Sequence, residues 1–173
     1  MRPDLIYMSI RERLMGLQHE QKLFPYRPPL RRQSAQRRIF LTTPKLAEDG
    51  FVAAALTRFV VGDRIYRGFL KRLDPPPEEI WEIRVTQPRP QWRLFGRFAE
   101  PDTLILTGFF TRGHLGDKGS EAWREAMADC AEHWEALFPN HAPYSAASIH
   151  DYVTENCDDF PVNSSGKRRP RPP

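Results

Sequence analysis

The chain has 173 residues, with 26 lysines and arginines, 22 aspartates and glutamates, and a formal net charge of +4. Hydrophobic residues make up 40% and charged residues 28%, a balance typical of soluble globular proteins. No apolar stretch approaches the roughly 18 residues that a membrane-spanning helix requires. The N-terminal residues also lack the apolar core of a signal peptide. We therefore expect a cytoplasmic protein with no membrane partner.

The cysteines and histidines give no pattern of a metal or cofactor site. Cys130 and Cys157 are too few for a disulfide framework, and neither a CxxC nor an HExxH motif is present. Five residues near the C-terminus have side chains that bind metals: His150, Asp151, Cys157, Asp158 and Asp159. Their spacing fits no site that we can defend, so we expect no metal and no cofactor.

Charge is divided unevenly along the chain. Residues 1–38 hold nine basic and three acidic side chains, whereas residues 120–163 hold one basic and nine acidic side chains. The last segment, residues 164–173, holds four basic side chains and no acidic one. This asymmetry indicates an anionic partner at one surface. Equally, such runs are found as solvated faces and tails.

Residues 1–37 are interpreted as a basic N-terminal arm. Apolar residues at helical spacing predict a short amphipathic helix within residues 9–23. The prolines of residues 24–30 then favour an extended chain. Four arginines follow in or beside the arm: Arg31, Arg32, Arg37 and Arg38.

The next segment predicts one strand and two helices. Residues 38–42 (RIFLT) are typical of a short strand, and residues 45–61 have the apolar spacing of a helix. Asp63 is a suitable cap for a second helix, which would carry Ile65, Phe69 and Leu73 on one face. The three prolines of residues 74–77 would end that helix.

Three strands are predicted next, over residues 80–86, 92–98 and 103–110. In the first, alternation places Glu82 and Arg84 on the face opposite Trp81, Ile83 and Val85. In the second, Arg93, Phe95 and Arg97 alternate with Trp92, Leu94 and Phe98. We expect helices on one face of this sheet. The other face, with Glu82, Arg84, Arg93 and Arg97, would then be open to water or to a ligand.

A polar loop and a final helix complete the domain. The loop covers residues 111–119, and Ser120 is a suitable helix cap. Five residues form one apolar helix face, which we interpret as core: Trp123, Met127, Cys130, Trp134 and Leu137. The domain would span residues 38–139. An acidic extension over residues 140–163, with a short helix within residues 146–153, and a disordered basic tail over residues 164–173 would follow.

The order of these motifs resembles the RelE/ParE toxin superfamily, and within it the HigB-like, phage-associated branch. The matching motifs are the strand at residues 80–84 (IWEIR), residues 92–94 (WRL), residues 106–109 (LTGF), the basic Arg112 and the acidic start of the last helix. The resemblance implies an α+β, RelE-like fold. Its small antiparallel sheet would combine an N-terminal strand with a three-strand meander, packed with two N-terminal helices and a C-terminal helix.

The resemblance also implies a function. It implies a metal-independent endoribonuclease that cuts mRNA on the ribosome by attack of a ribose 2′-hydroxyl and is neutralised by a cognate antitoxin, which we expect to be of the helix-turn-helix type. The same fold is also used by gyrase-targeting toxins. Arg84, Arg93, Arg112 and His114 would be the catalytic residues, because such cleavage requires cations beside the phosphate and a group that moves protons. Glu82 would be a base or the ion-pair partner of Arg84. The residues expected to bind RNA are Arg97, Lys118, Arg37, Arg38 and Trp92.

Two alternatives remain at this point. One is a non-catalytic RelE-fold module that binds RNA or a ribosome through salt-dependent phosphate contacts from the arm and from the tail residues 167–171. The other is a protein-interaction module of a phage or mobile element, docked through the acidic helix or the arm. The loop 113–119 (GHLGDKG) and the two extensions depart from the family pattern.

Overall fold

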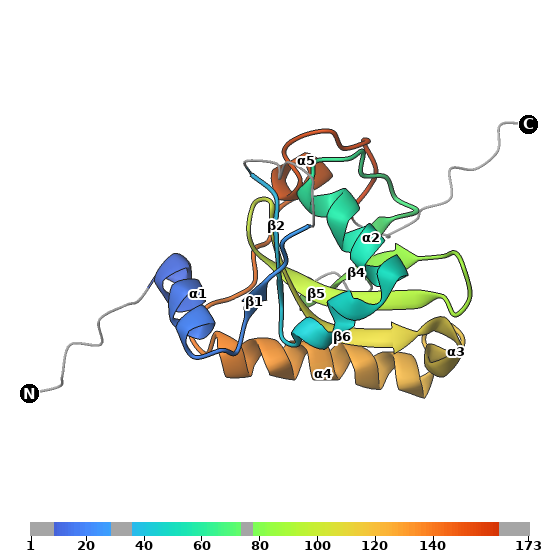
Figure 1. Ribbon diagram of the computed structural model, residues 1–173, viewed down its shortest axis with the longest axis horizontal. Coiled ribbons are helices and arrows are strands. Elements are labelled where there is room, and N and C mark those ends of the chain that lie inside the picture. The colour runs from blue at the N-terminus through green and yellow to red at the C-terminus, as the bar shows by residue number, and fades with distance from the viewer. Residues whose placement is uncertain (1–8, 29–35, 74–77, 163–173) are drawn as a thin grey trace, which may run out of the picture.

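The protein is an α+β structure built on one mixed sheet (Figure 1). The computed structural model describes residues 9–28, 36–73 and 78–162. The strands are β1 (Phe24–Pro25), β2 (Arg38–Leu41), β3 (Leu70–Arg72), β4 (Trp81–Val85), β5 (Trp92–Glu100) and β6 (Thr103–Thr111). The helices are α1 (Ile10–His19), the 3-10 helix η1 (Pro44–Glu48), α2 (Gly50–Val60), α3 (Arg112–Leu115), α4 (Glu121–Leu137) and α5 (Ile149–Tyr152). None of the helices in these ranges has the length and hydrophobicity that a membrane crossing requires.

The sheet contains the predicted meander but is larger than predicted. Strands β4, β5 and β6 pair antiparallel in sequence order, and the predicted first strand, β2, lies beside β6. The six strands have the order β1-β2-β6-β5-β4-β3, and the β2–β6 pair is parallel. The prediction of a small antiparallel sheet is therefore wrong in the number of strands and in the direction of the β2–β6 pair. The additional strands β1 and β3 are two and three residues long, too short for alternation to be visible in the sequence.

The predicted second helix, residues 63–73, is also wrong. Ile65 instead bridges to Cys157, a turn follows, and β3 pairs antiparallel with β4 with Leu70 opposite Ile83. Spacing by four, from Ile65 to Phe69 to Leu73, resembles a helix face. Pairing with β4 and burial of these side chains outweigh that weak local preference. Between β2 and β3, the described chain therefore has α2, with η1 leading into it, in place of the two predicted helices.

Helices cover both faces of the sheet, so the predicted open face does not exist. In Figure 1, α2 and α5 lie above the sheet and α4 runs beneath it. Leu56 and Phe59 of α2 pack with Trp81 and Phe98 in the upper core. In the lower layer, Trp123 and Met127 of α4 pack on Phe95. Alternation along a strand shows which residues share a face, but it does not show which face a distant helix covers.

Helix α4 otherwise agrees with its prediction. Ser120 caps it by accepting a hydrogen bond from the Trp123 backbone N–H at 3.2 Å. The apolar stripe, including Cys130, is buried, and the opposite acidic face is exposed. Burying a full apolar stripe is the main stabilisation that a helix of this kind receives.

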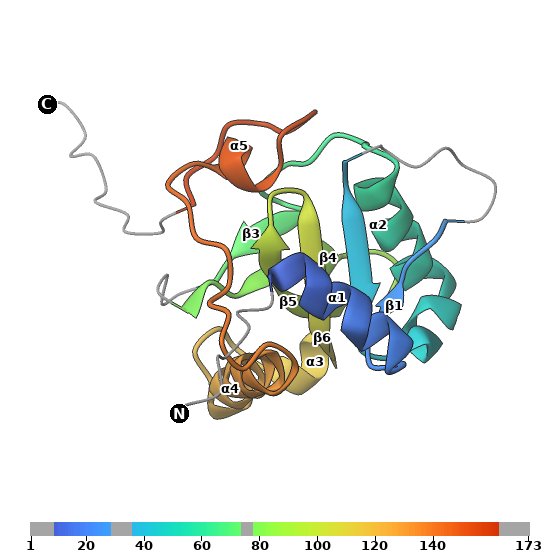
Figure 2. The ribbon, with the colours of Figure 1, turned by 90° about the vertical axis from the view of Figure 1, so that its left-hand side faces the viewer.

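The described parts of the N-terminal arm and of the C-terminal extension pack onto the sheet of the domain. Helix α1 begins with a capping box between Ser9 and Glu12, and its Leu14 and Leu17 pack in one cluster with Trp134 and Leu137. Figure 2 shows α1 in front of the sheet and α5 above it. Within the extension, Ile149, Tyr152 and Phe160 belong to the upper core. The short helix predicted within residues 146–153 is α5, and residues 1–8, 29–35 and 163–173 lie outside the described residues.

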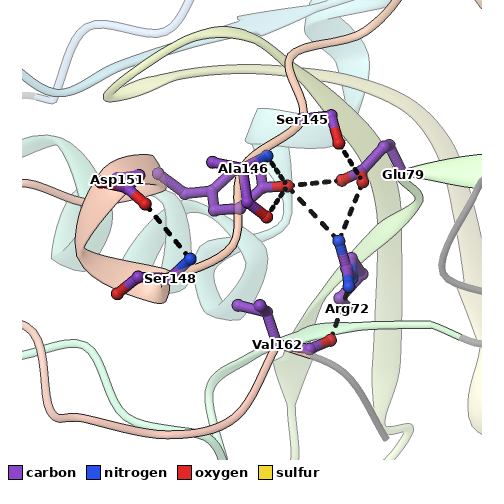
Figure 3. A network of polar contacts seen from close by, with 8 residues as sticks. Arg72, Glu79, Ser145, Ala146, Ser148, Asp151 and Val162 are labelled. Carbon is purple, nitrogen blue, oxygen red and sulfur yellow. Dashed lines mark hydrogen bonds and ion pairs between the residues drawn. The ribbon is translucent and has the colours of Figure 1, made fainter. Parts of the chain in front are cut away.

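A buried polar network holds the extension in place (Figure 3). Arg72 of β3 pairs with Glu79 at 2.8 Å, and its Nε donates to the Val162 carbonyl at 2.9 Å. Glu79 also accepts hydrogen bonds from the Ser145 hydroxyl at 2.8 Å and from the Tyr152 hydroxyl at 2.7 Å. Breaking such a pair by removing one partner leaves an uncompensated charge in the interior. The extension is therefore part of the folded core.

Candidate functional site

Three basic side chains gather around one carboxylate at the end of the sheet near the β4–β5 connection, and a fourth lies next to them. Three neighbouring strands contribute, because Lys71 lies opposite Glu82 and Arg84 lies opposite Arg93 in the strand register. Alternation places these side chains on the face of the sheet that α4 covers, near the N-terminal end of that helix. Arg112 follows directly at the end of β6. We call Lys71, Arg84, Arg93 and Arg112 the cation cluster, with Glu82 as its central carboxylate.

Glu82 holds two of these cations. Its side chain is fully buried, and Oε1 lies 2.6 Å from the Arg84 guanidinium. The other oxygen, Oε2, makes no hydrogen bond and lies 3.6 Å from Nε of Arg93. The interaction of Oε2 with Arg93 is therefore electrostatic attraction without a hydrogen bond. Glu82 therefore orients Arg84 closely and Arg93 more loosely.

Burial lowers the pKa values of Lys71 and Arg93 in the cluster, and neighbouring positive charges add to this effect. Burial, followed by the nearby charges of Lys118 and Arg84, holds the pKa of Lys71 below its usual value. Burial also lowers the pKa of Arg93, and the charges of Arg84 and Arg112 act in the same direction. Arg84 and Arg93 are directly opposed on adjacent strands, a position where like charges destabilise a sheet. An added anion would relieve this repulsion.

Arg112 and His114 lie on α3, which directly follows β6. The Arg112 guanidinium lies over the Trp123 ring, 5.8 Å from its centroid, and is half-buried. His114 is exposed, and its ring stacks on Phe110 with an interplanar angle of 9° and centroids 6.4 Å apart. Phe110 is the cross-strand neighbour of Arg93. One aromatic ring thus connects His114 to the cluster.

The structure brings together most of the predicted catalytic residues. Arg84, Arg93 and Arg112 belong to the cluster, His114 stands beside it, and the charge of Lys118 acts on Lys71. A groove of about 610 Å³ lies between the β4–β5 connection and α3, with Arg89 and Arg112 among its lining residues. Arg84 is 29% exposed and Arg93 is 9% exposed, so Arg84 and Arg112 are the more accessible of the three arginines.

The remaining predicted RNA-binding residues have other positions. Arg97 is 6% exposed, opposite Ile105 on the α4 side, where its charge acts on the Cys130 thiol. Arg37 is 2% exposed and donates to backbone carbonyls of Asp63 and Glu155, which anchors the extension. Trp92 is half-buried against the upper core. Burial keeps the Arg37 and Arg97 guanidiniums from an external phosphate, so neither enters the site that we propose.

Arg38 is exposed but lies at the other end of the sheet. It pairs with Glu100 and opposes Thr103, where β6 begins. The cluster lies near Phe110, seven residues further along β6, a separation of roughly 23 Å at the usual rise per residue. Arg31, Arg32 and the basic residues 167–171 lie outside the described residues.

Lys71 is the residue of the cluster that sequence reasoning missed. The helix predicted over residues 63–73 includes Lys71 and would give it different neighbours from those that it has in β3. Read as a strand, residues 70–72 would have put Lys71 on the same face as Glu82 and Arg84. Two short signals favour that interpretation: Gly68 before the segment and the prolines after it.

Comparison with known proteins gives no further guide. No protein-family model, no curated protein and no solved structure matches this chain. In residues 9–28, 36–73 and 78–162, no group of three or more His, Cys, Asp or Glu side chains is arranged to hold a metal ion. The RelE/ParE resemblance therefore stays a prediction from sequence motifs, and the functional argument rests on the cation cluster.

Proposed function

We propose that this protein binds an RNA phosphate at the cation cluster and cuts mRNA on the ribosome as an endoribonuclease of the RelE/ParE type. One observation carries the proposal: Lys71, Arg84 and Arg93 surround the buried Glu82 carboxylate, and Arg112 lies close enough for its charge to act on Arg93. Arginine forks pair well with phosphate oxygens and stay charged at any physiological pH. A cognate antitoxin that covers this end of the molecule would neutralise the protein.

The chemistry needs positive charge and proton transfer. The ribose 2′-oxygen attacks the adjacent phosphorus, the bond to the 5′-oxygen breaks, and the products are a 2′,3′-cyclic phosphate and a 5′-hydroxyl. One group takes the 2′-hydroxyl proton and another returns a proton to the departing oxygen. Arg84 and Arg112, the more exposed arginines, would bind the phosphate and stabilise the charge that develops on it.

Within this mechanism His114 is the candidate for proton transfer and Glu82 is a positioning residue. His114 is exposed and stands beside Phe110 at the cluster, and histidine is the side chain that enzymes use most often for proton transfer. Glu82 is fully buried and already paired with Arg84. Of the two sequence-based interpretations of Glu82, this geometry favours the ion-pair partner over the base.

A second candidate function is binding without cleavage. The observation that favours it is the burial of Glu82, because a 2′-hydroxyl cannot reach that carboxylate while it lies under Arg84 and Arg93. The same cations would then hold RNA on a ribosome or in a complex. Binding would weaken steeply with salt, since each phosphate contact releases counterions, and the RNA would stay intact.

Growth of bacteria that express the protein tests the proposal. We expect wild type to arrest growth and Arg93→Ala to relieve the arrest at equal expression. Arg11→Ala is the matched control, because Arg11 is 77% exposed on α1, at the opposite end of the molecule from α3 in Figure 1. Equal growth of cells that express folded wild type and folded Arg93→Ala would contradict the proposal.

A further inference from the structure

A second groove adjoins the cation cluster on the α2 side. It has a volume of about 250 Å³ and lies between the first turns of α2, the turn before β3 and the end of β4. Its walls include Phe51, Arg58, Tyr66, Phe69 and Arg84. We call it the aromatic groove.

Exposed aromatic rings are concentrated in this groove. Within the described chain, the exposed large hydrophobic side chains are Met15, Phe51 and Tyr66, at 62%, 55% and 41%. Two of these three line the aromatic groove. Exposed apolar side chains that gather beside one groove are a feature of interaction sites.

Arg58 contacts two of the aromatic side chains that line the groove. Its guanidinium carbon lies 5.5 Å from the centroid of the Phe69 ring, and its NH1 donates to the Tyr66 hydroxyl at 3.3 Å. The groove therefore holds a planar cation that contacts one exposed ring, Tyr66, and one buried ring, Phe69. Its walls include Arg58 and Arg84, and no carboxylate of the described residues lines it.

Arg84 connects the aromatic groove to the cation cluster. Arg84 lines the aromatic groove, and its guanidinium pairs with Glu82 of the cation cluster. The Arg84 backbone N–H donates to the Phe69 carbonyl at 2.8 Å, just before β3 begins. A ligand in the groove and an anion on the cluster would touch the same arginine.

We propose that the aromatic groove binds an unpaired nucleobase of the RNA strand whose neighbouring phosphate lies on the cation cluster. This inference rests on the proposed function, since it takes the cluster to be an RNA phosphate site. Unpaired bases are held by stacking on aromatic rings and arginine planes, which Phe51, Tyr66 and Arg58 supply. The volume falls below the 300–1,000 Å³ usual for drug-sized ligands and suits one planar ring system.

Binding of the full chain to two probes tests this assignment. One probe is a fluorescent single-stranded RNA oligonucleotide, and the other is inorganic polyphosphate of similar charge, which has no bases. We expect Phe51→Ala and Tyr66→Ala each to weaken RNA binding about 5- to 150-fold, the range for loss of one base stack, and to leave polyphosphate binding unchanged. Phe51→Leu, which keeps the apolar bulk without the ring, should behave like Phe51→Ala.

Two controls separate this inference from the proposed function. Met15→Ala removes an equally exposed side chain on α1 and should leave binding of both probes unchanged. Arg112→Ala should weaken binding of both probes. Loss of RNA binding alone in the Phe51 and Tyr66 variants supports the base site. If these variants bind RNA like wild type, or lose both probes equally, the base site is wrong while the phosphate site stands. If wild type binds neither probe, both proposals fail.

Discussion

Replacing Glu82 by glutamine removes the central carboxylate of the cation cluster and keeps its shape. In wild type the carboxylate lies 2.6 Å from the Arg84 guanidinium and 3.6 Å from Nε of Arg93. Breaking a buried ion pair in this way typically costs 3–5 kcal/mol. Because Arg84 keeps 29% of its side chain in water, we expect the lower end, about 3 kcal/mol. At roughly 2–4 °C per kcal/mol for a chain of this size, the melting temperature should fall by about 6–12 °C.

Added phosphate distinguishes an anion site from ordinary destabilisation. Glu82→Gln leaves the four cations of the cluster without their central negative charge, so an external anion should bind the variant more tightly than wild type. Ligand binding to the folded state raises its stability by mass action. Thermal melts by circular dichroism, in phosphate and in chloride at equal ionic strength, should show a larger gain in phosphate for Glu82→Gln than for wild type.

Glu132→Gln is the matched control for this experiment. Glu132 lies on the exposed acidic face of α4, where a substitution of this kind changes stability by less than about 0.5 kcal/mol. The reasoning fails if Glu82→Gln melts at the same temperature as Glu132→Gln. It also fails if phosphate and chloride stabilise Glu82→Gln equally, because the cluster would then have no preference for a phosphate.

Three further predictions follow from single residues. Arg112→Ala should flatten the dependence of RNA affinity on salt by about 0.7 in log–log slope, whereas an unchanged slope in a binding titration would exclude a phosphate contact at Arg112. Burial raises the pKa of the Cys130 thiol to about 11, so iodoacetamide at pH 8 should label it only after denaturation, and rapid labelling of the folded protein would contradict its burial. Burial, assisted by a hydrogen bond with Glu79, raises the pKa of Tyr152 to about 12. The unfolded chain loses that proton near pH 10, so the free energy of unfolding should fall between pH 10 and 12 by up to about 1.4 kcal/mol per pH unit. In urea unfolding, Tyr152→Phe should lack this part of the decrease in the free energy of unfolding. An identical pH dependence in both proteins would contradict the raised pKa of Tyr152.

Local patterns in the sequence identify much of the fold correctly. Alternation over residues 80–86 and 92–98, and the almost wholly apolar run of residues 103–110, predict three strands, and the structure has β4, β5 and β6 there. The stripe of α4 and its Ser120 cap are likewise local signals. Because β4 and β5 are adjacent in the meander, alternation was sufficient to bring Glu82, Arg84 and Arg93 together.

Non-local packing decides what the sequence did not reveal. Strand β3 forms because it pairs with β4. A strand of three residues is too short for an alternating pattern to be recognised in the sequence. For that reason Lys71 was assigned to a helix. The covering of both sheet faces depends on α4 beneath β5 and on residues 140–162 above it, contacts between segments far apart in the chain. Arg97 shares its strand face with Arg93, yet α4 buries it, so sharing a face does not imply sharing a site.

The central claim is that the cation cluster cuts mRNA, and primer extension on a translation reaction tests it most directly. Purified wild type, Arg112→Ala and Arg11→Ala would each be added to a reconstituted translation system, with and without ribosomes, after thermal melts show that all three are folded. We predict ribosome-dependent cuts with 5′-hydroxyl ends for wild type and Arg11→Ala, and none for Arg112→Ala. Intact mRNA with folded wild type, or equal cutting by Arg112→Ala, would contradict the claim.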